Sequence, residues 1–227
     1  KPYRLAKEAK VKTREQRIDF FGGVVAKSVQ PQLQMQTERL TWMIKEEKLI
    51  GNSAMQIDRL KNNKITDRGR GDAAEVFLKT EIVNITKNAF IELLDPLVQI
   101  ASNSMSWNVK AENIKTNAPL KVVHRAENIT VSGNRGEFKI PSKTVYVQGN
   151  VKGIGEKGQS IQSNNLTWHL DKQLVEASGN VVYGQTSPQL TFKGETATGN
   201  FKTENVVVKR GNSSERVITE IIPQFNN

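Results

Sequence analysis

The sequence has no cysteine and only two histidines among its 227 residues. The absence of cysteine excludes a disulfide scaffold, a thiolate zinc site and a cysteine nucleophile. Aromatic residues make up 6% of the chain, which is few for a surface on which nucleic-acid bases stack. No apolar run reaches the roughly 18 residues that a membrane-spanning helix needs. A chain of this length can nevertheless bury one large core or two small ones.

Motifs of common catalytic sites are missing as well. The sequence contains no Gly-x-Ser-x-Gly elbow and no HExxH pair. His124 and His169 lie among strand-like residues, and we interpret both as surface or groove-lining side chains rather than metal ligands. Residues 153–158 match GxGxxG, but a β-like segment follows instead of the helix that a dinucleotide site needs, so a hairpin loop is predicted. We therefore expect no catalytic residue, no cofactor and no metal.

Positive charge is concentrated at one end of the chain, whose net charge is +10. Residues 1–17 hold seven Lys or Arg against Glu8 and Glu15, so about half of the net charge lies there. We predict a basic arm over residues 1–17 with an anionic partner, either nucleic acid, a membrane surface or a phosphorylated lipid; a solvated flexible end is the alternative. Because the sequence begins at Lys1, we expect a segment such as a signal peptide or anchor upstream.

The rest of the chain has the pattern of β-strands. Val145, Val147 and Val151 recur with a period of two among polar residues, and segment 166–170 repeats this alternation. Gly-Asn pairs punctuate the strand-like segments and predict turns. This pattern is typical of antiparallel strands that cover one side of a core, and it predicts an all-β fold. We place the β domain at residues 18–211 and a tail at 212–227. Residues 89–94 fit a helix or a strand equally well.

An internal repeat contains all three tryptophans. Segments 40–45, 105–110 and 166–171 share the order apolar, hydroxyl, Trp, any residue, aliphatic, charged. Gly-Asn-Val recurs at 149–151 and 179–181. We interpret the unit as an antiparallel hairpin of about 30 residues that buries only one face, so that neighbouring hairpins must stack to form a core.

Several short segments resemble one family. Residues 95–98, 106–112 and the Gly-Asn-Val segments resemble LptC of the lipopolysaccharide export machinery, while 34–42 and 188–192 are more similar to the related LptA and OstA-like domains. The resemblance spans about residues 19–211. It implies an open β-jelly roll of two antiparallel sheets. It also implies a periplasmic protein, anchored to the inner membrane by an upstream segment, that passes lipopolysaccharide from an inner-membrane ABC transporter to a periplasmic bridge protein.

Such a carrier needs an apolar lining for acyl chains and basic residues for anionic head groups. We expect the lining to include Trp42, Ile44, Phe77, Phe90, Trp107, Val109, Phe138, Val145, Val147, Trp168, Leu170 and Phe192. We expect Lys121, Arg125 and Lys139 to contact sugar or phosphate groups.

Stacked hairpins leave an unpaired strand at each end of the stack, and such edges can bind a partner by strand addition. Phe20–Gln34 is the predicted N-terminal edge, which by family analogy faces the transporter. Phe201–Lys209 is the predicted C-terminal edge, which faces an LptA-like bridge. The same edges would allow a head-to-tail oligomer.

Three other classes of protein stay open at this point. A basic nucleic-acid-binding β-protein would use the positive arm, although most aromatic residues alternate on inner faces. A structural β-solenoid or adhesin would share the repeat, but the 65 and 61 residues between successive tryptophans are less uniform than a solenoid requires. A polysaccharide-degrading enzyme could hide an acid pair that sequence spacing does not reveal.

Overall fold

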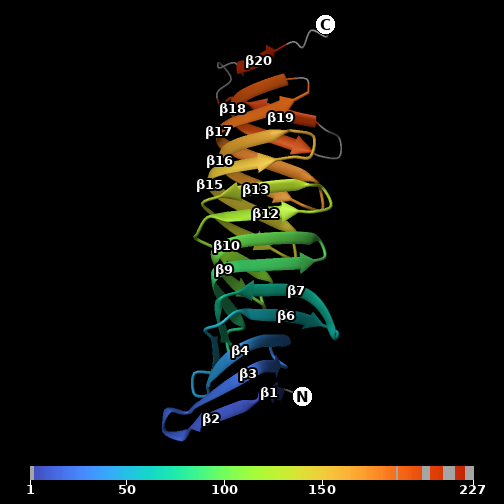
Figure 1. Ribbon diagram of the computed structural model, residues 1–227. Helices are drawn as coiled ribbons and strands as arrows, with labels where there is room; N and C mark the ends of the chain where they lie inside the picture. Colours follow the sequence, from blue (N-terminus) through green and yellow to red (C-terminus); the bar gives the residue numbers. More distant parts are fainter. Residues whose placement is uncertain (1–2, 188, 201–204, 212–217, 223–227) are drawn as a thin grey trace. The chain divides into compact units, whose positions relative to one another are not determined.

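The computed structural model describes residues 3–187, 189–200, 205–211 and 218–222, and almost all of their regular secondary structure is antiparallel β-strand (Figure 1). The all-β prediction is confirmed. In these ranges the one helical element is the 3₁₀ turn η1, Thr13–Glu15, and no helix is long and apolar enough to span a bilayer. The chain forms two compact units, Lys1–Ala118 and Pro119–Asn227, called the N-terminal and C-terminal units below.

The N-terminal unit contains eleven of the described strands. They are β1 (Tyr3–Leu5), β2 (Glu8–Lys12), β3 (Arg17–Ser28), β4 (Leu33–Met43), β5 (Lys48–Gly51), β6 (Met55–Lys61), β7 (Lys64–Gly71), β8 (Ala73–Phe77), β9 (Ile82–Leu94), β10 (Leu97–Asn108) and β11 (Asn113–Thr116). Residues 89–94, which fit either a helix or a strand by sequence, belong to β9. Within this segment Ala89, Ile91 and Leu93 are buried with the period of a strand.

The C-terminal unit contains nine of the described strands. They are β12 (Leu120–His124), β13 (Ile129–Gly133), β14 (Arg135–Lys139), β15 (Thr144–Ile154), β16 (Ser160–His169), β17 (Leu174–Thr186), β18 (Gln189–Asn200), β19 (Asn205–Lys209) and β20 (Ile218–Ile222).

Long strands bend in the middle and contribute one half to each of two sheets. The first half of β15 pairs with β14, whereas its second half pairs with β13. In the N-terminal unit β9 likewise pairs with β8 through its first half and with β7 through its second. A Cβ atom built on Gly69 of β7 would meet Ile85 and Trp107, which lie in the other sheet. The two sheets therefore face each other across a core, as in the predicted open β-jelly roll.

Gly-Asn pairs at 149–150 and 179–180 produce this bend in the C-terminal unit. The prediction that they form turns is wrong, because both pairs lie inside strands, at shifts in the pairing register of β15 and β17. Both residues of each pair have positive φ, 76° and 48° in the first and 78° and 53° in the second. Glycine and asparagine adopt this conformation most readily, so the pairs mark bulges where a strand passes between sheets.

The repeat is visible in a series of stacked turns. The turn residues Gln16, Glu47, Glu81, Lys143 and Gln173 share a left-handed conformation. In the N-terminal unit the N–H of Leu78 donates to the carbonyl of Glu47 and that of Val109 to Glu81, both at 2.9 Å. In the C-terminal unit Leu170 donates to Lys143 at 3.0 Å. Each of the three repeated tryptophans lies at the end of a strand, two residues before the aliphatic residue of such a turn.

Candidate functional site

The predicted lining residues fall into two groups. Seven are core residues with at most 8% of their surface exposed: Trp107, Val109, Phe138, Val145, Val147, Trp168 and Leu170. The other five, Trp42, Ile44, Phe77, Phe90 and Phe192, are partly or fully exposed on strands and turns of both units. The structure does not bring these twelve residues together around one groove. That they contact lipid stays a prediction.

A different set of residues forms an apolar cleft between the two sheets of the C-terminal unit. One wall comes from β13 and from the second half of β15, the first half of β16 and the second half of β17. The other wall comes from the second half of β16, the first half of β17, the second half of β18 and β19. The lining residues of this apolar cleft are Ile129, Val131, Gly153, Ile154, Gly155, Gln159, Ser160, Ile161, Leu166, Val175, Tyr183, Ala197, Gly199 and Val206. Its recess has a volume of about 50 Å³.

Two glycines line the apolar cleft, one at a close approach and one beside open space. A Cβ atom on Gly153 would lie 2.7 Å from Cγ2 of Ile161, so no larger residue fits there without a shift. A Cβ atom on Gly199 would meet only Val206, at 3.4 Å, and Asn205, at 3.9 Å, and otherwise points into open space. Isolated inward glycines in strands are a sequence signal for close approach or empty space, and this signal could have located the cleft.

A polar rim surrounds the mouth of the apolar cleft. It is formed by Glu127, Glu156, Lys157, Gln185, Ser187 and Asn200, around an outer basin of about 280 Å³ that shares Ile129, Gly155, Gln159, Tyr183, Gly199 and Val206 with the recess. The predicted hairpin loop at the GxGxxG match is confirmed, since β15 ends at Ile154 and β16 begins at Ser160. This loop supplies part of the rim.

Side-chain hydrogen bonds connect the turns that form the rim. Gln173 Nε2 donates to Glu127 Oε1 at 2.9 Å, joining the β16–β17 turn to the β12–β13 turn, and Asn128 Nδ2 donates to Glu156 Oε1 at 2.9 Å. The first bond joins turns from the two sheets of the unit, and the second joins two turns of the same sheet. Among the lining residues, the Tyr183 hydroxyl lies 3.4 Å from Gln185 Oε1, and burial raises the pKa of this tyrosine.

His124 is a buried residue that helps to position the Glu127 turn of the rim. Its side chain is 9% exposed and contacts the Trp168 ring edge-on, with 5.8 Å between the ring centres. The backbone N–H of Glu127 donates to its Nδ1 at 3.2 Å. Burial lowers the pKa of His124, although nearby Glu127 opposes this shift. The histidine is therefore a neutral acceptor that holds the Glu127 turn in place.

The three predicted head-group residues are exposed but lie elsewhere. Lys121 is on β12, Arg125 follows that strand, and Lys139 ends β14, where its Nζ lies 5.2 Å from the centre of the Tyr146 ring. None of the three lines the apolar cleft or its rim. Their contact with sugar or phosphate stays a prediction.

His169 and the carboxylates do not gather into a metal site in the described part of the chain. His169 Nε2 lies 3.2 Å from Glu176 Oε2. In the described ranges no group of three or more His, Asp or Glu side chains is close enough to hold a metal ion.

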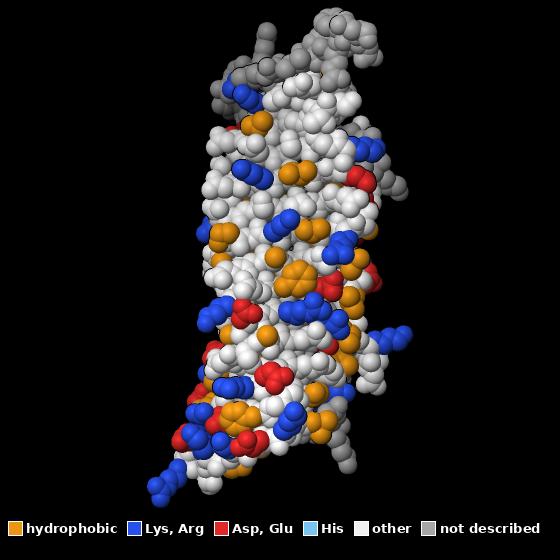
Figure 2. All heavy atoms as spheres, viewed as in Figure 1, with side chains coloured by type: hydrophobic (Ala, Val, Ile, Leu, Met, Phe, Trp, Pro, Cys, Tyr) orange, Lys and Arg blue, Asp and Glu red, His pale blue; other side chains and the backbone are white. Residues whose placement is uncertain are grey.

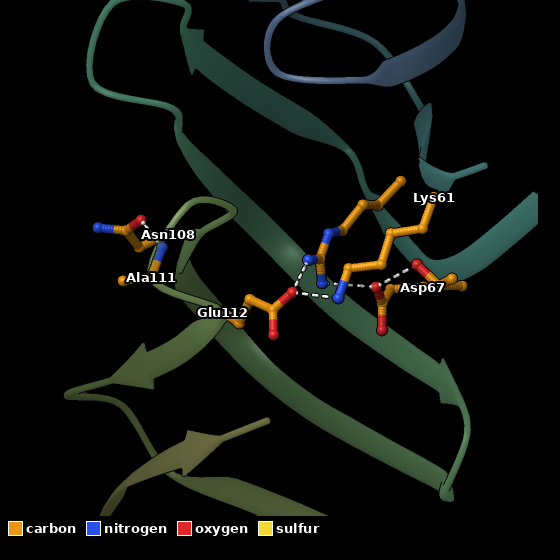
Figure 3. A network of polar contacts seen from close by, with 7 residues as sticks. Lys61, Asp67, Asn108, Ala111 and Glu112 are labelled. Carbon is orange, nitrogen blue, oxygen red and sulfur yellow. Dashed lines mark hydrogen bonds and ion pairs between the residues drawn. The ribbon is translucent and has the colours of Figure 1, made fainter. Parts of the chain in front are cut away.

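The N-terminal unit has buried ions at the corresponding side of its sandwich (Figure 3). Arg59 of β6 points between the sheets, where its Nη1 lies 3.0 Å from Asp67 Oδ2 and its Nη2 contacts Glu112 in the β10–β11 turn. Lys61 also contacts Glu112. Only 7% of the Arg59 side chain and 5% of the Asp67 side chain are exposed. This ion-pair network joins the two sheets of the N-terminal unit.

The basic N-terminal segment folds as part of this unit. Lys10 pairs with Glu8 at 3.3 Å, and Glu15 pairs with both Lys12 and Arg17 at 3.7 Å. Figure 2 shows acidic side chains mixed with the basic ones over the first strands. The described part of the arm is thus a mixed surface rather than a continuous basic track.

The edge strands differ from the prediction at one end. Phe20–Gln34 is not the N-terminal edge, because β1 and β2 pair with the two halves of β3. At the other end β19, Asn205–Lys209, pairs within the described residues with β18 alone. It covers the second part of the predicted edge; residues 201–204 lie outside the described part. Strand β20 pairs with the first half of β18.

No protein-family profile and no curated protein matches the chain. The chain is similar to LptH from Pseudomonas aeruginosa, described as the LptA-homologous periplasmic component of the conserved lipopolysaccharide transport device. The TM-score is 0.45 at 9% identity, and the match covers 50% of this chain and 80% of that chain. A function for this chain therefore has to be argued from its own residues.

Proposed function

We propose that this chain is a periplasmic lipopolysaccharide-binding component of the lipopolysaccharide export machinery. The observation that carries the proposal is the apolar cleft, which opens between two sheets and is rimmed by polar groups. Transfer of an acyl chain out of water yields about 0.8 kcal/mol per buried CH₂ group. A carrier gains this free energy by covering part of a chain that would otherwise face water.

The relay step uses the ends of the fold. Strand β19 offers an edge to a bridge protein similar to LptA, and β1 and β2 offer edges to subunits of the inner-membrane ABC transporter, by β-strand addition. The sequence contains no P-loop motif. In this proposal the energy that moves the lipid comes from the transporter, and this chain is a passive, non-enzymatic carrier.

A blocked cleft tests the proposal. Gly199→Leu places a side chain in open space inside the apolar cleft, whereas Thr198→Leu adds the same side chain on the exposed face of the same strand. Binding of lipopolysaccharide is measured at about 0.15 M salt by displacement of the neutral probe N-phenyl-1-naphthylamine, with duplex DNA as a parallel ligand.

We expect saturable binding of lipopolysaccharide that Gly199→Leu weakens roughly tenfold, as expected for an apolar contact worth about 1.4 kcal/mol, and that Thr198→Leu leaves unchanged. Equal binding by both variants would show that the cleft does not hold lipid. Displacement by DNA would instead favour a nucleic-acid-binding protein.

A further inference from the structure

The charge at the rim of the apolar cleft is the opposite of what an anionic head group needs. Glu127 and Glu156 contribute two carboxylates, and Lys157 contributes the one cationic side chain among the rim residues. Neutral amides, Gln173 and Asn128, donate the hydrogen bonds to the two carboxylates. Two carboxylates against one ammonium leave the described rim residues with an excess of negative charge, which disfavours phosphate and sulfate.

The other polar groups at the mouth are neutral. Gln159, Gln185 and Asn200 provide side-chain amides, and Tyr183 provides a hydroxyl. Amides and hydroxyls can both donate and accept hydrogen bonds. They suit the hydroxyl, ester or amide groups that adjoin an acyl chain in many lipids.

The size of the recess limits what can enter. The recess has a volume of about 50 Å³, against about 280 Å³ for the outer basin. The recess therefore accepts the end of a single chain, with the next part of the chain in the outer basin.

We propose that the apolar cleft takes one linear acyl chain whose adjoining polar group is uncharged, and that anionic groups of the ligand stay beyond the rim. This inference rests on the proposed lipid-binding function and makes it more specific. The carboxylates of Glu127 and Glu156 set the preference by repelling anionic head groups. Exposed cations such as Lys121, Arg125 and Lys139, which do not line the rim, would act only on parts of a ligand outside the cleft.

Two amphiphiles with the same chain test this preference. Dodecyl maltoside is neutral and dodecyl phosphate is anionic; each is titrated below its micelle concentration at about 0.15 M salt against bound N-phenyl-1-naphthylamine. The proteins are the full chain, the Glu127→Gln/Glu156→Gln double variant and Gly199→Leu. Glutamine can still accept the hydrogen bonds from Gln173 and Asn128, so the double variant changes charge with little change in shape.

We expect the ratio of the two dissociation constants to favour the neutral amphiphile in the unmodified chain. We expect the double variant to reduce that ratio roughly threefold, as for partly screened charges near the surface. Gly199→Leu should weaken both ligands together. Tighter binding of dodecyl phosphate, or a ratio unchanged in the double variant, would overturn the inference while leaving lipid binding intact. Failure of both amphiphiles to bind would instead overturn the proposed function.

Discussion

The two units share one fold but differ in the side chains that lie between their facing sheets. In the N-terminal unit a buried arginine and two carboxylates join the facing sheets. In the C-terminal unit the facing sheets leave an apolar cleft, and neutral amides hold its rim. Both units have bent strands and stacked turns. The difference arises from a few side chains between the sheets, so the interior can be closed or open without a change of fold.

Removing Arg59 should have the largest effect on this comparison. Arg59→Ala leaves Asp67 buried with a hydrogen bond from Thr66 but without its cation. We expect the free energy of unfolding of the N-terminal unit to fall by about 3–5 kcal/mol. Urea unfolding followed by peptide-resolved hydrogen exchange measures the loss for each unit separately.

Lys61→Ala is the matched control, because Lys61 contacts the same Glu112 from a side chain that is 54% exposed. Exposed ion pairs contribute about 0–1 kcal/mol. Similar losses for the two variants would mean that the Arg59 ion pair is not specially buried. The double variant Arg59→Met/Asp67→Leu should recover most of the stability, since it leaves no unpaired ion.

Substitution of alanine for an inward-facing glycine in each unit compares the closed interior of the N-terminal unit with the open cleft of the C-terminal unit. At Gly69 a new Cβ would lie 2.7 Å from Cδ1 of Ile85 and 3.4 Å from the Trp107 ring. We expect Gly69→Ala to cost about 1–3 kcal/mol by overpacking. At Gly199 there is space, and the same change should be neutral or stabilise by about 0.4–1 kcal/mol through the unfolded chain. Thermal unfolding distinguishes these outcomes; equal costs at both sites would contradict an open cleft.

Strand periodicity made the fold predictable from sequence. Alternation such as Val145 and Val147, together with the repeated Trp-x-aliphatic order, indicated stacked antiparallel hairpins, and both valines are buried. The residue types predict turns at the Gly-Asn pairs 149–150 and 179–180, which instead lie inside strands. Positive φ is needed at a bulge as well as at a turn, and the residue types alone do not distinguish the two.

The apolar cleft was harder to predict than the fold. Inward aromatic residues such as Trp107 and Trp168 fill space, so they mark the closed core. An open cleft needs small residues, and Gly199 leaves open space while ordinary aliphatic residues line the cleft. The pairing of Arg59 with Glu112 crosses from one sheet to the other over a long stretch of chain, and no local sequence pattern indicates such a contact.

The two units should also differ in their response to acid. Burial lowers the pKa of His124, so below about pH 6.5 the unfolded chain binds more protons and the C-terminal unit loses stability as pH falls. Burial alone would raise the pKa of Glu112, but hydrogen bonds from Lys61 and Arg59 outweigh this effect and lower it. The contribution of Glu112 is therefore present above about pH 4.3 and is lost only as pH falls further.

Hydrogen exchange in urea at pH 7.5 and 5.5, corrected for intrinsic exchange rates, should show destabilisation confined to the C-terminal unit. His124→Asn keeps an oxygen acceptor for the Glu127 N–H and does not titrate, so it should remove this pH dependence. A loss of stability in both units over the same pH range, or a persistent effect in His124→Asn, would contradict the assignment to His124.

The smallest expected effect concerns the hydrogen bond between Gln173 and Glu127 at the rim. Gln173→Ala removes the amide donor from a partly exposed site, so we expect the free energy of unfolding of the C-terminal unit to fall by about 0.5–1.5 kcal/mol. This loss is smaller than the one expected for the N-terminal unit in Arg59→Ala. The same change should accelerate entry of dodecyl maltoside into the apolar cleft, because this bond joins turns from the two sheets that form the mouth. Stopped-flow binding and urea unfolding measure the two effects. Asn128→Gly, which removes the amide donor to Glu156 at 2.9 Å between two turns of the same sheet, is the control and should leave the entry rate unchanged. Equal acceleration by both variants would mean that loss of rim polarity, rather than release of one turn from the other, controls entry.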